Sequence, residues 1–248
     1  MNNLVDKRVL ITSGPTRGYI DAVRYITNSS TGKLGSLIAT EYLKNKAKVT
    51  FIYGKDSALP GIKNKNLKLI EITTAADLLS MLKKELKSNK YKVMIHLAAV
   101  SDYESERISR GKLKSDKREL VIKLKKTPKI IERIKLFAPE VFLVGFKLEV
   151  GISKEELISR ACNSLVKNNA DLVVANDLMN INESRHHAFI IDRNKKIVAK
   201  ANTKIEIAKK LIKLIQIYSK KRKSHPKASP LGYRSAYGFR QDLTPRRK

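Results

Sequence analysis

The sequence predicts an α/β fold, in which a mostly parallel sheet carries helices on both of its faces. Two observations support this prediction. Short apolar runs alternate with segments of helical periodicity along most of the chain, which is the pattern of β-α-β units. Several of these runs are apolar at every position, as strands are when both faces of a sheet are covered. Right-handed crossovers between such strands give a doubly wound, Rossmann-like sheet.

The first half of the chain carries signals for three strands and two helices. Thr74 and Asp77 have the spacing of a capping box, which marks the start of the second helix. The segment 101–116 has no apolar period and predicts a long mobile loop. The predicted strands are 8–12, 49–53 and 93–98, and the predicted helices are 32–44 and 74–86.

The second half begins with 120–124, where apolar and charged residues alternate as in an exposed strand. Ser153 with Glu156 and Thr203 with Glu206 predict two capped helix starts. The polar residues 192–195 predict the turn of a hairpin. Together the strands are 120–124, 141–146, 172–175, 188–191 and 197–199, and the helices are 128–136, 153–166 and 203–218.

Composition narrows the class of protein. The 248 residues are 42% hydrophobic, which is enough for a folded core. No apolar run approaches the roughly 18 residues of a membrane-spanning helix, and residues 1–7 lack a secretory signal, so we expect a cytoplasmic protein without membrane contact. The single cysteine, Cys162, excludes an internal disulfide framework and a thiolate metal cluster, and no residues are assigned to a metal site.

The net charge of +29 divides the chain into two parts. In residues 1–218 the basic residues are scattered singly, which favours a solvated surface over a nucleic-acid site. Residues 219–248 carry ten Lys and Arg against Asp242 alone and include Pro226 and Pro230, which predicts a disordered basic tail. Its interleaved aromatic residues could contact RNA, but we favour an extension without such a role.

In a doubly wound sheet the ligand binds beyond the carboxyl ends of the strands. The loop 13–18 is small and polar, and Gly14 would let its backbone approach a phosphate, although the glycine spacing is not that of a dinucleotide-binding loop. In 24–35, four small polar residues precede Gly32 at a helix start, which favours an anion. Leu34 excludes a Walker loop. Taken alone, an ordinary helix cap explains this segment slightly better.

Six motifs, taken in order, resemble those of the phosphopantothenate–cysteine ligases (phosphopantothenoylcysteine synthetases) of coenzyme A biosynthesis. The resemblance covers residues 8–218 and is closest to the stand-alone bacterial form. We expect no room in this chain for the flavin-dependent decarboxylase domain that many bacteria fuse upstream. The motifs are SGPT at 13–16, VRYITNSSTG at 23–32, AAVSDY at 98–103, KTPKI at 126–130, GFKL at 145–148 and VAND at 174–177.

The resemblance implies a two-step ligation. The carboxylate of 4'-phosphopantothenate attacks the α-phosphate of a nucleoside triphosphate, pyrophosphate leaves, and an acyl-nucleotidylate forms. The amine of L-cysteine then attacks the acyl carbon and releases the nucleoside monophosphate. CTP is the nucleotide typical of bacterial members and ATP of eukaryotic ones, and Mg²⁺ would offset the phosphate charge. The substrate carboxylate is the nucleophile, so alignment and charge stabilisation would carry the rate.

The resemblance also implies the roles of particular residues. Asn28 would donate to the reacting acyl or phosphoryl oxygen, and Lys112 would be the lysine of a mobile flap, with Lys114 as the fallback because the loop before it is short. Ala98 and Ala99 would make room for the pantoyl arm, and Asp102 would accept from its polar groups. The residues assigned to the nucleotide are Gly14, Ser30, Gly32, Gly35, Thr127, Pro128, Lys129, Ile130, Phe146, Lys167 and Asn176.

Some expectations stay open. Lys167 lies one position from where the family pattern expects a lysine, and the strand 120–124 falls in the family's dimerisation and flap region, so we expect a homodimer. A nicotinamide-dependent oxidoreductase and a basic RNA-binding module are the alternative functions. Adjacent residues of a strand point to opposite faces, so His186 and His187 are read as surface residues rather than metal ligands. His96 is read as a core histidine.

Overall fold

The computed structural model describes residues 7–116 and 118–224, with side chains through 218. Its centre is an eight-stranded sheet in the order β12-β11-β10-β9-β6-β1-β4-β5, of which the last six in this order are parallel to one another. β11 and β12 continue the sheet in antiparallel pairing. The bounds are β1 Arg8–Ser13, β4 Lys48–Gly54, β5 Leu67–Ile72, β6 Val93–His96, β9 Phe142–Glu149, β10 Leu172–Asp177, β11 Ala188–Asp192 and β12 Ile197–Ala201.

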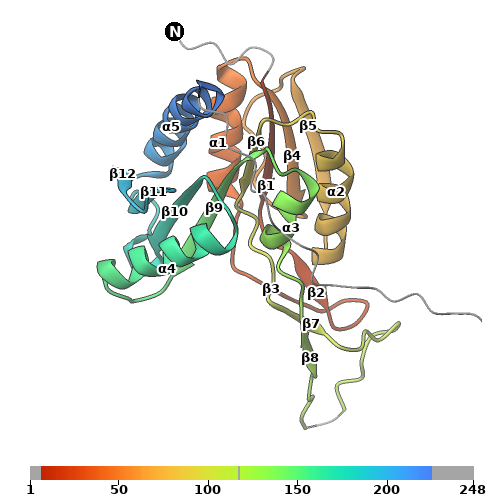
Figure 1. Ribbon diagram of the computed structural model, residues 1–248. Helices are drawn as coiled ribbons and strands as arrows, with labels where there is room; N and C mark the ends of the chain where they lie inside the picture. Colours follow the sequence, from red (N-terminus) through yellow and green to blue (C-terminus); the bar gives the residue numbers. More distant parts are fainter. Residues whose placement is uncertain (1–6, 117, 225–248) are drawn as a thin grey trace, which may run out of the picture.

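Helices cover both faces of this sheet, which confirms the predicted α/β class (Figure 1). Alternate residues of each strand enter one of two separate cores, because successive side chains of a strand point to opposite faces. In β1, Val9 and Ile11 face α1 and α5, whereas Leu10 faces α2. The helices are α1 Lys33–Lys44, α2 Ala75–Lys87, α3 Ile130–Phe137, α4 Lys154–Lys167 and α5 Lys204–Ser224.

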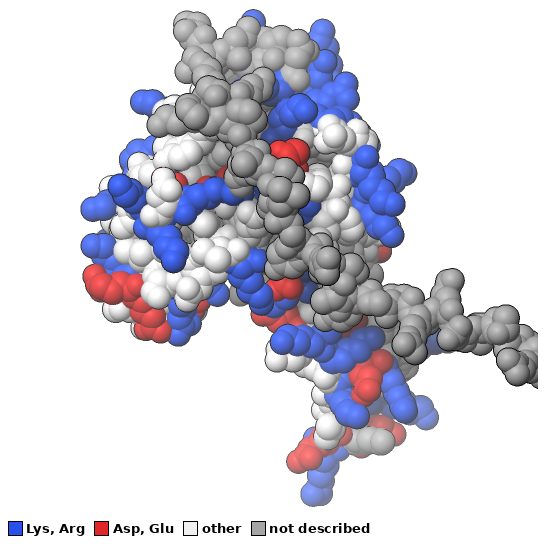
Figure 2. Space-filling view, in the orientation of Figure 1, with Lys and Arg blue, Asp and Glu red and all other residues white. Residues whose placement is uncertain are grey.

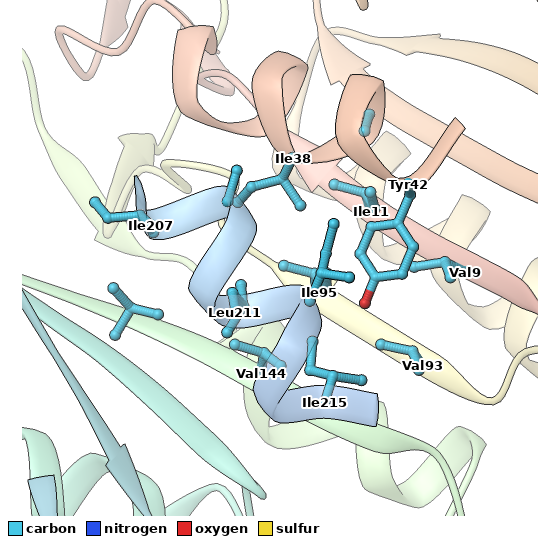
Figure 3. Close-up of a cluster of buried hydrophobic side chains, with 14 of the residues drawn as sticks. Val9, Ile11, Ile38, Tyr42, Val93, Ile95, Val144, Ile207, Leu211 and Ile215 are labelled. Atoms are coloured by element: carbon cyan, nitrogen blue, oxygen red, sulfur yellow. The ribbon is translucent and has the colours of Figure 1, made fainter. Parts of the chain in front are cut away.

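The core under α1 and α5 shows how the helical periodicity becomes packing. Figure 3 shows Ile38 and Tyr42 of α1 and three side chains of α5 meeting apolar residues of β1, β6 and β9. The α5 residues lie three or four positions apart and therefore on one face of the helix. They are Ile207, Leu211 and Ile215, each at most 5% exposed.

The three helix starts predicted from capping residues are confirmed, whereas α3 begins at Ile130, two residues after the predicted start at 128. Thr74 accepts a hydrogen bond from the backbone N–H of Asp77, and the Asp77 carboxylate accepts from Thr74 in return. Ser153 accepts from the Glu156 N–H at 3.1 Å. At α5, Thr203 accepts from the Glu206 N–H, and the Glu206 carboxylate accepts from the Asn202 N–H. Each cap satisfies backbone donors that the first turn leaves unpaired.

Two small ribbons extend from the carboxyl edge of the sheet, at the bottom of Figure 1. One pairs β2, Arg17–Tyr19, with β3, Tyr25–Thr27. The other pairs β7, Tyr103–Ser105, with β8, Leu124–Lys126. The prediction of a strand over 120–124 was therefore wrong in its position: the ladder runs only from Leu124, with one further hydrogen bond from the Glu106 N–H to the Lys123 carbonyl. The predicted loop 101–116 also contains β7.

Other features lie at the limits of the predictions. α5 continues to Ser224, so the backbone of the first residues of the predicted tail 219–248 is helical, and the rest of that tail is outside the described residues. None of the helices in the described part of the chain is both long and apolar enough to cross a membrane. Figure 2 shows Lys and Arg side chains spread over the body and the protruding ribbons.

Candidate functional site

The loops after β1 and β6 lie side by side at the carboxyl edge of the sheet. Pro15 and Ala99 form a parallel bridge. The Ala99 N–H donates to the Gly14 carbonyl at 2.9 Å, and the Thr16 N–H donates to the Ala99 carbonyl at 3.2 Å. The Ser101 N–H extends the contact by donating to the Thr16 hydroxyl at 3.0 Å. Two motifs more than 80 residues apart are therefore held together at this edge. We call the joined backbone of residues 14–16 and 99–101 the floor of the site.

Asn28 joins this floor from a third segment. Its side-chain Nδ2 donates to the Ala99 carbonyl at 3.1 Å. β3 carries it there, because Thr27 donates its hydroxyl to the Thr16 carbonyl at 2.9 Å. Asn28 itself is exposed. One N–H of its amide is thus fixed, while a second N–H and the carbonyl oxygen have capacity for a ligand.

Gly14 and Gly32 shape the space beside this floor. Both have left-handed backbones, with φ of 75° and 72°, a region that favours glycine. A Cβ on Gly14 would lie 1.8 Å from the Ser57 hydroxyl. The Ser57 Oγ is buried and has no hydrogen-bond partner among the described residues. Ser57 therefore packs directly against both glycine backbones and requires a residue without a side chain at position 14.

The start of α1 packs tightly on β1. Ser13 donates its hydroxyl to the Gly32 carbonyl at 3.1 Å. A Cβ on Gly35 would lie 2.2 Å from the Ser13 hydroxyl oxygen, so Gly35 lets the helix approach the strand. Gly35 is buried, and Ser30 is half-buried one turn before the helix. The roles of both residues toward a phosphate stay predictions.

Asp102 and the segment 127–130 form the next part of this edge. The Thr127 N–H donates to the Asp102 carbonyl at 2.9 Å, and its hydroxyl donates to the Ser101 carbonyl. Lys129 pairs with the Asp102 carboxylate, whose side chain is 61% exposed. Pro128 is exposed and Ile130 is buried as the first residue of α3. The structure therefore brings Asp102 and 127–130 next to the Ala99 floor, as a shared site requires.

A buried carboxylate fixes the segment that carries Lys112. Asp21, 1% exposed, accepts from the Leu113 N–H at 3.1 Å as well as from the Val23 and Arg24 N–H groups. Burial alone would raise the pKa of Asp21, but these backbone hydrogen bonds outweigh it and lower the pKa. Arg24 donates from Nη2 to the Leu113 carbonyl at 2.7 Å. Both polar groups of the Leu113 backbone are thus held by the β2–β3 ribbon.

Lys112 and Lys114 flank this fixed residue and are both exposed. Residues 112–116 line an open depression beside the ribbon. Because the same ribbon carries Asn28, the position of the lysine segment is coupled to that of the amide. No local pattern marks Asp21 for this role, because its partner lies 92 residues away.

The nucleotide-binding residues predicted on β9 and β10 lie on strands that end at the same edge of the sheet as the loop carrying Ala99. Phe146 is half-buried against the core under α1, and Asn176 is 7% exposed near the end of β10. No hydrogen bond within the described residues links either to Asn28. Lys167 lies in the last turn of α4, where it pairs with Glu132 of α3 at 2.9 Å. The three assignments stay predictions.

The histidines illustrate one confirmed and one wrong prediction. His96 is a core residue as predicted: burial lowers its pKa to about 4, and its Nδ1 lies 2.8 Å from the Thr12 hydroxyl. The prediction that His186 is a surface residue was wrong, because it is 7% exposed. Burial, followed by the charge of Lys204, lowers its pKa to about 4. His187 is exposed as predicted, and Cys162 is buried.

The donor set fits a magnesium ion that arrives on a triphosphate rather than one held by a protein cage. In residues 7–116 and 118–224, no three His, Cys, Asp or Glu side chains gather as ligands would. Mg²⁺ is commonly bound through phosphates and water with few protein carboxylates. The carboxylate at the edge described above, Asp102, is exposed and already paired with Lys129.

Taken together, a doubly wound sheet with a polar edge built from the loops after β1, β3 and β6 defines a ligand-binding α/β protein. The family model for the DNA/pantothenate metabolism flavoprotein C-terminal domain matches residues 4–218. The chain belongs to this family.

Relatives and solved structures agree with this assignment. The chain is 43% identical over 209 residues to the coenzyme A biosynthesis bifunctional protein CoaBC of Thermococcus kodakarensis, covering 84% of this chain and 51% of that protein. It is 35% identical to CoaBC of Borreliella burgdorferi, covering 86% and 53%. The chain thus spans about half the length of these curated relatives.

Among solved structures, the DNA/pantothenate metabolism flavoprotein from Streptococcus pneumoniae is 36% identical with a TM-score of 0.78, covering 86% of this chain and 99% of that chain. A structure of a Cab2 mutant in complex with phosphopantothenate-cysteine has a TM-score of 0.73 and covers 90% of this chain and 89% of that chain. Its 22% identity shows the fold alone.

Proposed function

We propose that this protein is a phosphopantothenate–cysteine ligase of coenzyme A biosynthesis. The observation that carries the proposal is the hydrogen bond between Asn28 and the Ala99 carbonyl, 3.1 Å long, which joins two of the resembling motifs across 71 residues. The family match and the coenzyme A biosynthesis proteins among its relatives support the same function. Neither the oxidoreductase nor the RNA-binding alternative gains support from these relatives.

In the first half-reaction the carboxylate oxygen of 4'-phosphopantothenate forms a bond to the α-phosphorus, and the bond to pyrophosphate breaks. Asn28 would donate its unfixed N–H to the reacting oxygen, and an amide does so without changing its protonation state. Lys112, on the segment held by Asp21 and Arg24, would neutralise charge on the triphosphate. Bound Mg²⁺ would supply further neutralisation of the phosphates.

In the second half-reaction the amine nitrogen of L-cysteine forms a bond to the acyl carbon, and the acyl bond to the nucleoside monophosphate breaks. The protein would contribute chiefly by holding the acyl group still. Asp102, with one carboxylate oxygen on Lys129, would accept from the pantoyl hydroxyl or amide with the other. Ala98 and Ala99 are half-buried, and their small side chains would make room for the pantoyl arm.

The nucleotide, the oligomer and the location complete the proposal. CTP is the proposed nucleotide, with ATP as the alternative, and the binding residues are those assigned at 14, 30, 32, 35, 127–130, 146, 167 and 176. A homodimer in the cytoplasm is the proposed state. The exposed apolar segment beside β8, where Val121 is 88% exposed, supports the homodimer.

The test is pyrophosphate release by the full chain with CTP or ATP and Mg²⁺, with and without 4'-phosphopantothenate. We expect release only when both the nucleotide and 4'-phosphopantothenate are present, and amide product only after L-cysteine is added. NADPH binding without any nucleotide response would contradict the ligase and favour the oxidoreductase.

Replacing the key amide tests the role of one residue. Asn28→Ala removes the N–H groups near the reacting oxygen, so we expect kcat to fall by roughly a hundredfold or more. Asn163→Ala, an exposed asparagine on α4, is the matched control and should keep normal turnover. The thermal unfolding midpoint of both variants should stay near that of the unmodified chain. Normal turnover of Asn28→Ala would contradict the assigned role.

A further inference from the structure

A second cavity lies at the amino edge of the sheet, opposite the proposed active site. Its volume is about 270 Å³. It opens where β1, β4 and β5 begin and where the chain enters β6 (Figure 1). Four segments that are distant in sequence supply its basic residues, which are Arg8, Lys48, Lys65, Lys68 and Lys90.

The inner wall of the cavity is polar and fixed. Tyr91 is 4% exposed, and its hydroxyl donates to Glu85 and lies 2.8 Å from the Thr50 hydroxyl. Glu85, 5% exposed, also accepts from Lys68 at 2.7 Å and pairs with Lys90 at 2.9 Å. Both of its oxygens are therefore occupied, and it holds two of the lysines in place along the wall.

Positive charge exceeds negative charge at this cavity. Burial alone would raise the pKa of Glu85, but hydrogen bonds from Lys68, Tyr91 and Lys90 lower it to about 2, so Glu85 carries a single negative charge at neutral pH. Within the described residues, Arg8 and Lys65 have no acidic partner at ion-pair distance. Arg8 and Lys65, together with Lys68 and Lys90 around the one carboxylate of Glu85, focus a positive potential into the cavity.

We propose that this cavity is a binding site for the phosphate or diphosphate group of a small molecule. The arginine and lysine side chains around it offer the charged donors that phosphate oxygens accept. About 270 Å³ is near the lower end of ligand-pocket volumes, which suits a phosphorylated group better than a whole dinucleotide. A nucleic-acid backbone would instead need a basic track that continues over many phosphates.

The experiment follows backbone amide resonances of the full chain while inorganic pyrophosphate is added at about 150 mM salt, where exposed charges are screened. This readout separates the cavity from the proposed active site and from the basic tail. We expect saturable shifts at residues 65–68 and 90–91. The double variant Arg8→Ala/Lys65→Ala, which removes two exposed side chains, should weaken binding at these residues at least tenfold and leave ligase turnover unchanged.

Lys83→Ala/Lys87→Ala is the matched control, because it removes the same charge from exposed positions of α2 outside the cavity. It should retain the shifts. Linear, unsaturable shifts at 65–68, or saturable shifts that survive Arg8→Ala/Lys65→Ala, would overturn the proposal. Tighter binding of a short RNA at the same amides, with affinity that rises with its length, would also overturn it in favour of a nucleic-acid surface.

Discussion

Gly14 is the residue at which backbone conformation and site geometry depend most directly on each other. Its φ of 75° and the 1.8 Å approach of the Ser57 hydroxyl leave no room for a Cβ. We expect Gly14→Ala to lower the free energy of unfolding by about 2–4 kcal/mol. Urea unfolding measures this. Gly61→Ala, where nothing lies within 4 Å of the added Cβ, should change it by less than about 0.5 kcal/mol. Equal effects of the two substitutions would contradict the steric argument.

His186 gives a prediction about pH. Its pKa is about 4 in the folded protein against 6.5 in the unfolded chain. The unfolded chain therefore binds a proton first as the pH falls, so stability is complete above pH 6.5 and is lost between pH 6.5 and 4. The contribution is up to about 3 kcal/mol. His96 has the same depressed pKa and contributes in the same window.

The substitution that tests this is His186→Leu. Neither ring nitrogen of His186 has a hydrogen-bond partner in the described structure, so an apolar side chain costs no hydrogen bond. We expect urea unfolding to give a clearly smaller loss of stability between pH 6.5 and 4 than in the unmodified chain, with His96 and carboxylates such as Glu85 contributing to the rest. His187→Gln, at an exposed position, should leave the loss unchanged. A His186→Leu variant with the full original loss would refute the buried assignment.

At the scale of single residues, the sequence could predict those site members that belong to motifs. Asn28 donates to the Ala99 carbonyl and Asp102 follows in the same loop, while the roles of these three residues stay predictions. Asp21 could not be found in this way, because it acts through Leu113 on a distant segment and does not stand in a recognisable pattern. The prediction for His186 was wrong because strand alternation shows that adjacent residues point to opposite faces. It does not show which of these faces is covered by the rest of the protein.

Among the elements, the β2–β3 ribbon has the most direct influence on the proposed chemistry. It carries Asn28 and also holds both backbone groups of Leu113. Asp21→Ala removes the acceptor for the Leu113 N–H, so the lysine segment should move more freely. We expect faster trypsin cleavage after Lys112 and Lys114, measured by mass spectrometry of the fragments. Pyrophosphate release should fall by roughly tenfold to a hundredfold, because displacement of a catalytic group is costly.

Asp116→Ala is the control for this prediction, since Asp116 is an exposed carboxylate in the same segment. It should leave both the cleavage pattern and the turnover unchanged. If Asp21→Ala also left both unchanged, the hydrogen bonds to Leu113 would have no part in positioning Lys112.

Elements with strong local signals were predicted well, and those that depend on neighbours were not. Buried strands such as β1 and β10 are apolar throughout, and the capped helices begin where their capping residues lie. β5 was missed because it is an edge strand with mostly exposed or half-buried residues. The strand at 120–124 was misplaced because its alternation is real, but the partner β7 ends at Ser105.

On the scale of the whole molecule, the parallel sheet separates two chemical environments. The carboxyl edge gathers polar loops, an exposed amide and the lysine segment, whereas the amino edge gathers the cationic cavity around Tyr91. The length of the strands between them separates the two edges. A ligand at one edge can therefore be studied by substitutions that leave the other edge intact, which is the basis of the cavity experiment.

The unpaired segment beside β8 predicts the assembly. Leu120 is 49% exposed, Val121 88% and Leu124 41%, and no strand in the described part of the chain pairs with 120–122. An apolar, alternating segment with free backbone groups is a template for a strand of another chain. We expect a second copy of this protein to supply that strand, which would give a closed twofold dimer.

Val121→Asp tests this assembly, because it puts a charge in the proposed interface without touching the cores of the monomer. Light scattering coupled to size-exclusion chromatography should give a dimer for the unmodified chain at about 10 µM and a monomer for the variant, which corresponds to a loss of at least about 1.4 kcal/mol. Val166→Asp, at a 60% exposed position on α4, should remain a dimer. A monomeric unmodified chain, or a dimeric Val121→Asp variant, would show that 120–124 is not the interface. The lysine segment 112–116 lies in the connection between β7 and β8, next to the proposed interface. Loss of the dimer should therefore also slow pyrophosphate release.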